Sequence, residues 1–437
     1  MPTSMLGLAN KAQERKQYVF KGLYALINEE FLHDSWQTIR KDAAYGVDRI
    51  SAKEYEQNLD ENIRNLVERL KRNFYHAKLV RRQYIPKPDG RQRPLGIPAT
   101  EDKLLQLAVT RILQAIYEQD FLSCSYGYRP MRSALDAVFK LTDELQFGPF
   151  NYVVEADIKG FFDNLDHEKL IGMLEKRIGD PRLLRLIKKW LKAGVLDTDG
   201  KVIHPATGTP QGGIVSPVLA NVYLHYVLDQ WFETVVKANC SGKAFLIRYA
   251  DDFVCAFQRK EDAEQFYKVL ELRLGEFGLQ LAADKTRVIR FTRGDKSGTG
   301  RFDFLGFEFH WGLDRNGKDH IERRTSRKKL RNSLHNFTQW CKVNRDLPIS
   351  RIFLTLNRKL RGYYNYYAVT GNFASLKEFY DQANRILLKW LNRRSQRRSF
   401  NWKGFADLLK HFKVPRPSIV HTPARIAERR LRLRTCV

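Results

Sequence analysis

Paired cysteines, long apolar runs and acidic residues are all scarce in this chain. Its five cysteines are scattered and form no CxxC pair, so the sequence predicts neither a disulfide framework nor a zinc knuckle. No uninterrupted apolar run reaches the roughly 18 residues of a membrane span, and the N-terminus lacks the apolar core of a signal peptide. We therefore expect a protein of the reducing cytoplasm that does not enter a membrane.

The shortage of acidic residues is concentrated in one part of the chain. The whole sequence holds 76 Lys and Arg against 49 Asp and Glu, a formal charge of +27. Residues 321–437 hold 28 basic and 6 acidic residues, so +22 of that charge lies in this last part. Neutralisation of phosphate charge dominates the binding of nucleic acids. The local excess of basic residues therefore favours a nucleic acid partner over an anionic membrane surface or a merely solvated basic face.

Two stretches place carboxylates at the ends of expected strands. Residues 245–257 (FLIRYADDFVCAF) predict a β-hairpin whose polar turn carries Asp251 and Asp252. Residues 152–163 (YVVEADIKGFFD) predict a buried strand that ends at Asp157. Such a set can hold two hard divalent ions about 3.5–4 Å apart for in-line phosphoryl displacement. The plain alternative, a solvated hairpin tip, is disfavoured by the apolar runs on both sides.

These stretches resemble motifs of the polymerase palm, and Tyr-Ala-Asp-Asp is the form typical of reverse transcriptases. From about residue 44 to about residue 420 the chain resembles the group II intron reverse transcriptase/maturases of bacterial type. The resemblance implies an α+β fold, in which a right-hand polymerase with fingers and palm is followed by an α-helical thumb/maturase domain. The expected domains are a helical N-terminal extension (1–80), fingers and palm (81–320), thumb/maturase (321–420) and a basic tail (421–437).

The resemblance also implies the catalytic and metal-binding residues. Asp157, Asp251 and Asp252 would be catalytic, and together with Ile158 they would bind two Mg²⁺ ions, for which Mn²⁺ could substitute. Phe162 falls five residues after the first aspartate, where a bulky ring would block a ribose 2′-hydroxyl and favour deoxynucleotides. The plain alternative for Phe162 and its neighbour Phe161 is two core aromatics.

Three further residues of the nucleotide site come from other segments. An Asp-Gly turn predicts a hairpin that places Lys87 and Arg93 on opposing strands, where the resemblance makes them ligands of the incoming triphosphate. Gln211 lies in a Pro-Gln-Gly signature beside the nucleotide. Lys285 would neutralise the triphosphate or the attacked phosphate.

Nucleic acid contacts are expected along the rest of the chain. Arg129, in Ser-Tyr-Gly-Tyr-Arg-Pro, would face the primer–template path or brace the fingers. Leu305 and Gly306 lie in an aromatic hairpin that the family uses as its primer grip. An RNA-facing strip near Trp390 would consist of Arg393, Arg394, Arg397 and Arg398.

The function implied is RNA-directed DNA polymerisation, together with binding of intron RNA as a splicing maturase. The partners would be an RNA template, such as a structured intron RNA, a DNA primer and dNTPs. The protein would act in the bacterial cytoplasm, associated with the nucleoid. Two alternatives stay open: a domesticated reverse transcriptase of antiviral defence or DNA repair, and a non-enzymatic RNA-binding splicing factor. Whether the protein forms a homodimer is open as well. The printed sequence holds no paired CxxC of a metal-bound endonuclease, so we expect no autonomous second-strand DNA cleavage.

Overall fold

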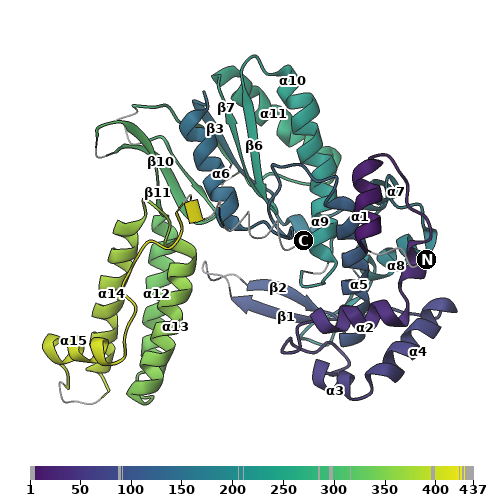
Figure 1. Ribbon diagram of the computed structural model, residues 1–437, viewed down its shortest axis with the longest axis horizontal. Coiled ribbons are helices and arrows are strands. Elements are labelled where there is room, and N and C mark those ends of the chain that lie inside the picture. The colour runs from purple at the N-terminus through teal and green to yellow at the C-terminus, as the bar shows by residue number, and fades with distance from the viewer. Residues whose placement is uncertain are drawn as a thin grey trace. The chain divides into compact units, whose positions relative to one another are not determined.

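A computed structural model gives the fold of the chain (Figure 1). It describes residues 5–86, 90, 92–204, 206–209, 211–283, 286–294, 299–314, 316–394, 399–422, 424–425 and 428. The chain forms two compact units, each built from several segments. Unit 1 consists of Met1–Arg132, Ala156–Phe253 and Glu264–Arg287, and unit 2 of Ser133–Glu155, Val254–Ala263 and Val288–Val437.

Helices make up most of unit 1. In α8, for example, the apolar residues lie on one face and the basic residues on the other, as in a surface helix that covers a core. The amphipathic pattern of residues 53–72 predicts one helix, but the segment is divided at Asn58 into α3 and α4, and a Ser51–Glu54 capping box begins α3. The helices are α1 (Met5–Glu14), η1 (Leu23–Leu26), α2 (Glu29–Thr38), α3 (Ala52–Gln57), α4 (Leu59–Lys71), α5 (Thr100–Tyr117), η2 (Phe161–Asp163), α7 (His167–Glu175), α8 (Pro181–Leu191), α9 (Ser216–Leu224), α10 (Lys237–Asn239) and most of α11 (Lys260–Glu276).

The sequence from Ser216 to about Ala238 predicts one long helix, and the structure shows a helical segment there that is not α-helical throughout. Two π-helical turns, η3 (His225–Asp229) and η4 (Phe232–Val236), separate α9 from α10. Such turns are rare and occur often at functional sites. Here η3 carries Asp229, a fully buried carboxylate, toward the hairpin described below.

The basic hairpin expected around residue 90 is confirmed. Strands β1 (Val80–Pro86) and β2 (Gln92–Ile97) pair in antiparallel register, with Ile85 opposite Arg93. The sheet continues in the order β2-β1-β4-β5, in which β4 (Val195–Leu196) lies parallel to β1. The sequence did not predict β4 or β5 (Val202–Ile203), because two-residue strands leave no periodic pattern.

The central sheet has the strand order β6-β7-β3-β8. The two middle strands, β7 and β3, are largely enclosed because most of their residues are apolar; Val153 and Val154 of β3 and Phe253 and Val254 of β7 are fully buried, whereas the edge strand β8 is partly exposed. The predicted hairpin and the predicted strand that ends at Asp157 are both confirmed. The four strands are β3 (Tyr152–Asp157), β6 (Ala244–Tyr249), β7 (Asp252–Phe257) and β8 (Arg287–Arg290).

Unit 2 contains a helical bundle with an apolar core formed by residues from Phe337 to Val414. In Figure 1 the three long helices α12, α13 and α14 run side by side, and α15 packs at one end. Apolar residues at helical spacing in 324–341, 350–370 and 376–394 predict three of these helices but not α15. Strand β11 spans residue 321, where the helical domain was expected to begin. The elements are α6 (Ala134–Phe147), β9 (Arg301–Phe304), β10 (Phe307–Leu313), β11 (Asp319–Thr325), α12 (Arg327–Asn344), α13 (Ile349–Tyr367), α14 (Phe373–Leu391) and α15 (Trp402–His411).

The aromatic hairpin of unit 2 turns at Leu305 and Gly306. Both residues have positive φ angles, 51° and 84°, and connect β9 to β10. Two successive left-handed residues are typical of the tightest hairpin turns, which match the twist of the strands. The Leu305 carbonyl accepts a 2.7 Å hydrogen bond from the Tyr366 hydroxyl, so α13 fixes this turn. Among the helices of the described residues, none is long and apolar enough to span a bilayer.

Candidate active site

The three predicted catalytic aspartates lie at strand ends in unit 1. Asp157 is the last residue of β3, and Asp252 is the first residue of β7. Between β6 and β7 the chain turns through Ala250 and Asp251. Ala250 adopts a left-handed conformation with φ of 57°, which is uncommon for a residue other than glycine. The tight turn therefore presents Asp251 and Asp252 at one edge of the sheet.

The Asp251 carboxyl is influenced by its burial and by neighbouring charges. Burial raises the pKa of the Asp251 carboxyl above its ordinary value, and the negative charge of Asp157 raises it further. The guanidinium groups of Arg93 and Arg248 act in the opposite direction. A cation bound beside Asp251 would stabilise its ionised form and offset the repulsion from the Asp157 charge.

The residues present fit a divalent metal, although the protein does not gather a complete ligand cluster by itself. In the described chain, no three His, Cys, Asp or Glu residues are grouped as metal ligands would be. Backbone oxygen offers one further ligand. Ile158 lies opposite Leu281 in an antiparallel bridge whose hydrogen bonds belong to the flanking residues, Lys159 and Asp157. The Ile158 carbonyl therefore faces the other edge of its strand, the edge on which β7 lies.

A buried arginine supports the turn that carries Asp251. Arg248 is fully enclosed and forms a two-pronged ion pair with Asp229, at 2.7 and 2.6 Å. Its guanidinium also donates to the Ala250 carbonyl at 3.0 Å, directly in the turn. The remaining hydrogen bonds reach the Asn221 side chain at 3.1 Å and the Ser125 hydroxyl at 2.7 Å. One cation thus connects the turn to η3, α9 and the segment that contains Ser125.

The segment that contains Ser125 lies directly against the same turn. The Tyr126 backbone N–H donates to the Arg248 carbonyl at 2.8 Å, and the Gly127 carbonyl accepts from the Asn221 side chain at 2.7 Å. A Cβ atom added to Gly127 would lie 2.3 Å from the Ala250 backbone nitrogen. Only glycine permits this close approach of the two backbones.

Replacing Gly127 with alanine is therefore expected to displace the catalytic turn. We expect DNA synthesis to fall by at least about tenfold and the protein to lose about 1–3 kcal/mol of stability, because the added methyl group meets backbone and not a flexible side chain. Primer extension and thermal unfolding measure the two effects. The matched control is Gly172→Ala in α7, where the new Cβ meets nothing within 4 Å and the substitution should be neutral or slightly stabilising. Equal activity of the two variants would contradict the expectation.

Phe162, Tyr128 and Arg93 surround the aspartates. Phe161 and Phe162 lie in the short helix η2, which follows the end of β3; Phe161 is buried in the core, whereas Phe162 is partly exposed. The Phe162 ring meets the Tyr128 ring edge-on, with centroids 6.4 Å apart. Burial raises the pKa of the Tyr128 hydroxyl, and the Asp251 charge adds to the effect. These rings and the Arg93 guanidinium therefore belong to one site.

The loop that carries Gln211 is clamped between η2 and the basic hairpin. The Thr209 N–H donates to the Phe162 carbonyl at 2.8 Å, and the Gln211 carbonyl accepts from the Gly96 N–H of β2 at 2.6 Å. Gln211 therefore lies beside both the aromatic pair and the strand that bears Arg93. His167, interpreted as structural, contacts the same loop through the Gly208 carbonyl at 2.6 Å.

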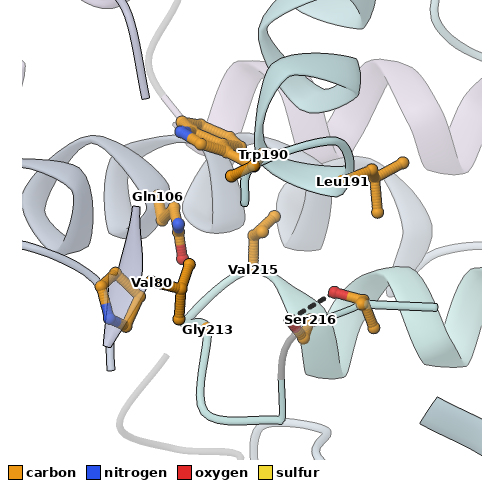
Figure 2. A pocket seen from close by; sticks show the side chains of 10 residues that line it. Val80, Gln106, Trp190, Leu191, Gly213, Val215 and Ser216 are labelled. Atoms are coloured by element: carbon orange, nitrogen blue, oxygen red, sulfur yellow. Dashed lines mark hydrogen bonds between the residues drawn. The ribbon is translucent and has the colours of Figure 1, made fainter. Parts of the chain in front are cut away.

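A small cavity lies behind this loop (Figure 2). Gln106 accepts a 2.9 Å hydrogen bond from the Ile214 N–H, and the Thr209 and Ser216 hydroxyls pair at 2.7 Å. In Figure 2, Trp190 closes one side of the cavity and Val215 another. The cavity has room for about one water molecule, too little for a nucleotide. The residues that line it support the loop through these hydrogen bonds.

Comparison with known proteins decides the family. Residues 85–309 match the family reverse transcriptase (RNA-dependent DNA polymerase). The chain belongs to this family. This reverse transcriptase is an RNA-directed DNA polymerase, and its residues 327–405 match the group II intron maturase-specific domain. The expected fold class and the expected enzyme class are thereby confirmed.

Curated relatives of this reverse transcriptase point the same way. The group II intron-encoded protein LtrA of Lactococcus lactis subsp. cremoris is 29% identical over 460 residues, covering 85% of this chain and 74% of the relative. Protein YkfC of Escherichia coli is 32% identical over 327 residues, covering 67% and 83%. The retron Mx162 reverse transcriptase of Myxococcus xanthus is 30% identical over 224 residues, covering 47% and 43%.

Other predicted residues of this reverse transcriptase lie outside the site just described. Arg129 is buried, with its guanidinium 2.9 Å from Glu118 and bonded to two backbone carbonyls, which favours the bracing role over a nucleic acid contact. Four of the residues predicted to contact nucleic acid belong to unit 2: Leu305, Gly306, Arg393 and Arg394. Arg393 is exposed and lies over the Trp390 ring at 5.3 Å. The remaining predicted residues lie outside the described residues: Lys87, Lys285, Arg397 and Arg398.

Three residues that organise the site were missed by the sequence reasoning. Arg248 and Asp229 form its buried ion pair, and Tyr128 packs on Phe162. One signal was available: a lone arginine inside the apolar run FLIRYADD must have a partner if the strand is buried. No local pattern indicates which carboxylate that partner is.

Proposed function

We propose that this reverse transcriptase copies an RNA template from a DNA primer by two-metal nucleotidyl transfer, with Asp157, Asp251 and Asp252 as its carboxylates. The observation that carries the proposal is that Asp157 ends β3 while Asp251 and Asp252 lie at the start of β7, the neighbouring strand of the sheet, close enough for the Asp157 charge to raise the pKa of the Asp251 carboxyl. Their side chains, together with the Ile158 carbonyl, would hold Mg²⁺, or Mn²⁺ in its place. When bound, the two ions would activate the primer 3′-hydroxyl and neutralise the charge that develops on the leaving pyrophosphate.

The remaining residues of the site bind and orient the nucleotide. The Arg93 guanidinium, close enough to Asp251 to lower the pKa of that carboxyl, is placed to bind phosphate oxygens in two-pronged fashion. Gln211, held between Phe162 and β2, offers an amide to the nucleotide. The partly exposed Phe162 ring would exclude a ribose 2′-hydroxyl. Lys87 and Lys285 would complete the triphosphate site.

The second part of the proposal concerns unit 2. Its match to a maturase-specific domain and the +22 charge of residues 321–437 support binding of a structured intron RNA and assistance to its splicing. Arg393 and Arg394, with Arg397 and Arg398, are the proposed RNA-facing strip, and Leu305-Gly306 the proposed primer grip. The domain boundaries expected from the sequence stay part of this proposal, as does action in a bacterial cytoplasm beside the nucleoid.

Primer extension tests the enzymatic part. The purified full chain is given a generic RNA template, an annealed DNA primer, dNTPs and Mg²⁺, and the products are separated by length. We expect complementary DNA, with far less product when NTPs replace dNTPs. A protein that binds the RNA tightly and extends nothing with either kind of nucleotide would overturn the enzyme and favour a splicing factor that keeps the palm as a scaffold.

A second measurement separates the mobile-intron role from a domesticated one. The DNA around the gene is examined for a group II ribozyme, and that RNA is transcribed and spliced with and without the protein. We expect the protein to lower the Mg²⁺ concentration that splicing requires. Complementary DNA synthesis together with no ribozyme nearby would favour defence or repair.

A further inference from the structure

The ring of Phe162, the residue proposed to exclude a ribose 2′-hydroxyl, contacts two other aromatic rings. On one side Phe161, which is 2% exposed, lies with its centroid 5.4 Å away and its plane at 70°. On the other side Tyr128, which is 47% exposed, lies 6.4 Å away at 78°. Both contacts are edge-to-face, the arrangement that aromatic quadrupoles favour. One neighbour of Phe162 is thus core, and the other faces the site.

The backbone of Tyr128 is unusual. Its φ angle is 58°, a left-handed conformation that is an outlier for a bulky residue and persists only where the surroundings enforce it. Both flanking residues supply that constraint. The Gly127 carbonyl is bonded to Asn221, and the buried Arg129 side chain is bonded to Glu118 and to the Leu122 and Ser125 carbonyls. The backbone of Tyr128, and with it the direction of its Cα–Cβ bond, is therefore held from both sides.

The outward side of Tyr128 faces the catalytic charges. Asp251 and Arg93 both act on the ionisation of its hydroxyl. That hydroxyl makes no hydrogen bond with any residue in the part of the chain that the structure describes. The ring, and not the hydroxyl, is what Tyr128 contributes to its neighbours.

We infer that Tyr128 is a specificity-determining residue, which fixes the position of the Phe162 ring and thereby sets the discrimination between deoxyribo- and ribonucleotides. The inference rests on the proposed role of Phe162 as the gate. A gate excludes a hydroxyl only if it cannot swing away, and phenylalanine has several side-chain rotamers. Phe161 blocks the inward movement, and Tyr128 blocks the movement toward the site. Without the Tyr128 ring, Phe162 gains freedom, and a ribonucleotide displaces it at lower cost.

Three single variants of the full chain test this inference. Tyr128→Asn removes the ring and keeps a residue that tolerates the left-handed backbone, Tyr128→Phe keeps the ring, and Phe162→Ala removes the gate. The measured quantity is kcat/KM for a dNTP divided by kcat/KM for the matching rNTP. We expect Tyr128→Asn to lower this ratio by roughly tenfold, mainly through faster use of the rNTP, and Phe162→Ala to lower it further. Tyr128→Phe should stay within about twofold of the wild type.

A double variant shows whether Tyr128 acts through Phe162. If it does, adding Tyr128→Asn to Phe162→Ala causes no further loss of discrimination, because the ring to be positioned is gone. If Tyr128→Asn slows dNTP and rNTP use equally, Tyr128 is only structural and the inference is overturned. If Phe162→Ala leaves the ratio unchanged, the gate itself is disproved, which is a distinct failure. Should Tyr128→Asn not fold, Tyr128→His also accepts the left-handed backbone and gives the same test.

Discussion

Replacing Asp251 with asparagine is expected to abolish DNA synthesis, with a fall of about 10³-fold or more, while the protein stays folded and bound to RNA. The substitution removes one negative charge from a site whose chemistry depends on concentrated charge, and it changes the side-chain volume little. Primer extension at saturating dNTP measures the loss. Asp60→Asn is the matched control, because the Asp60 side chain is 82% exposed and lies outside the site. Retention of activity by Asp251→Asn would refute the assignment of the catalytic carboxylates.

The same variant is expected to stabilise the metal-free protein at neutral pH. Burial raises the pKa of Asp251, so the folded state favours the protonated carboxyl, and its contribution to stability is lost as the pH rises through that raised pKa. Asparagine imitates the protonated form at every pH. The thermal midpoint of the variant should therefore equal that of the wild type below about pH 4 and exceed it by a few degrees near pH 7. Mg²⁺ should close the gap, because it binds the wild type preferentially.

Replacing Arg248 with methionine is expected to have the largest effect on stability. The variant leaves the Asp229 carboxylate fully buried without its counter-ion, which costs about 3–5 kcal/mol. It also removes the hydrogen bond to the Ala250 carbonyl, so the turn that carries Asp251 loses its support. We expect a lowered thermal midpoint together with a strong fall in kcat.

A second substitution separates the two consequences. Adding Asp229→Leu to Arg248→Met replaces the ion pair with apolar side chains, and such replacements are often neutral for stability. We expect the double variant to recover most of the lost stability and little of the lost activity, because the Ala250 carbonyl still lacks its donor. Recovery of both would show that Arg248 stabilises the fold without positioning the catalytic turn.

Much of this site could be predicted because its signals are local. The hairpin at residues 245–257, the strand that ends at Asp157 and the basic hairpin that bears Arg93 all follow from alternation and turn residues within a few positions. Local signals also gave the long amphipathic helices. The expected helix over 53–72 failed at Asn58, a residue of low helix propensity.

The remaining features depend on contacts between segments far apart in sequence. Nothing near Arg248 shows that its partner lies 19 residues upstream, and nothing near Tyr128 shows that its ring meets Phe162. Arg129 illustrates the same limit, because the motif that contains it did not distinguish bracing from nucleic acid contact. Its neighbour Glu118 supports the first role only once the fold brings the two together.

The π-helical turns after α9 make the length of this segment critical. A π turn holds about one residue more than an α turn, so each residue inserted or deleted rotates everything downstream by about 100°. Asp229 meets Arg248 only with η3 in its present register. Shortening the segment by a single residue would aim this carboxylate away from the hairpin, even with every named side chain retained. A chimera in which this segment is shortened to a continuous α-helix would therefore disrupt the site without altering any of its residues.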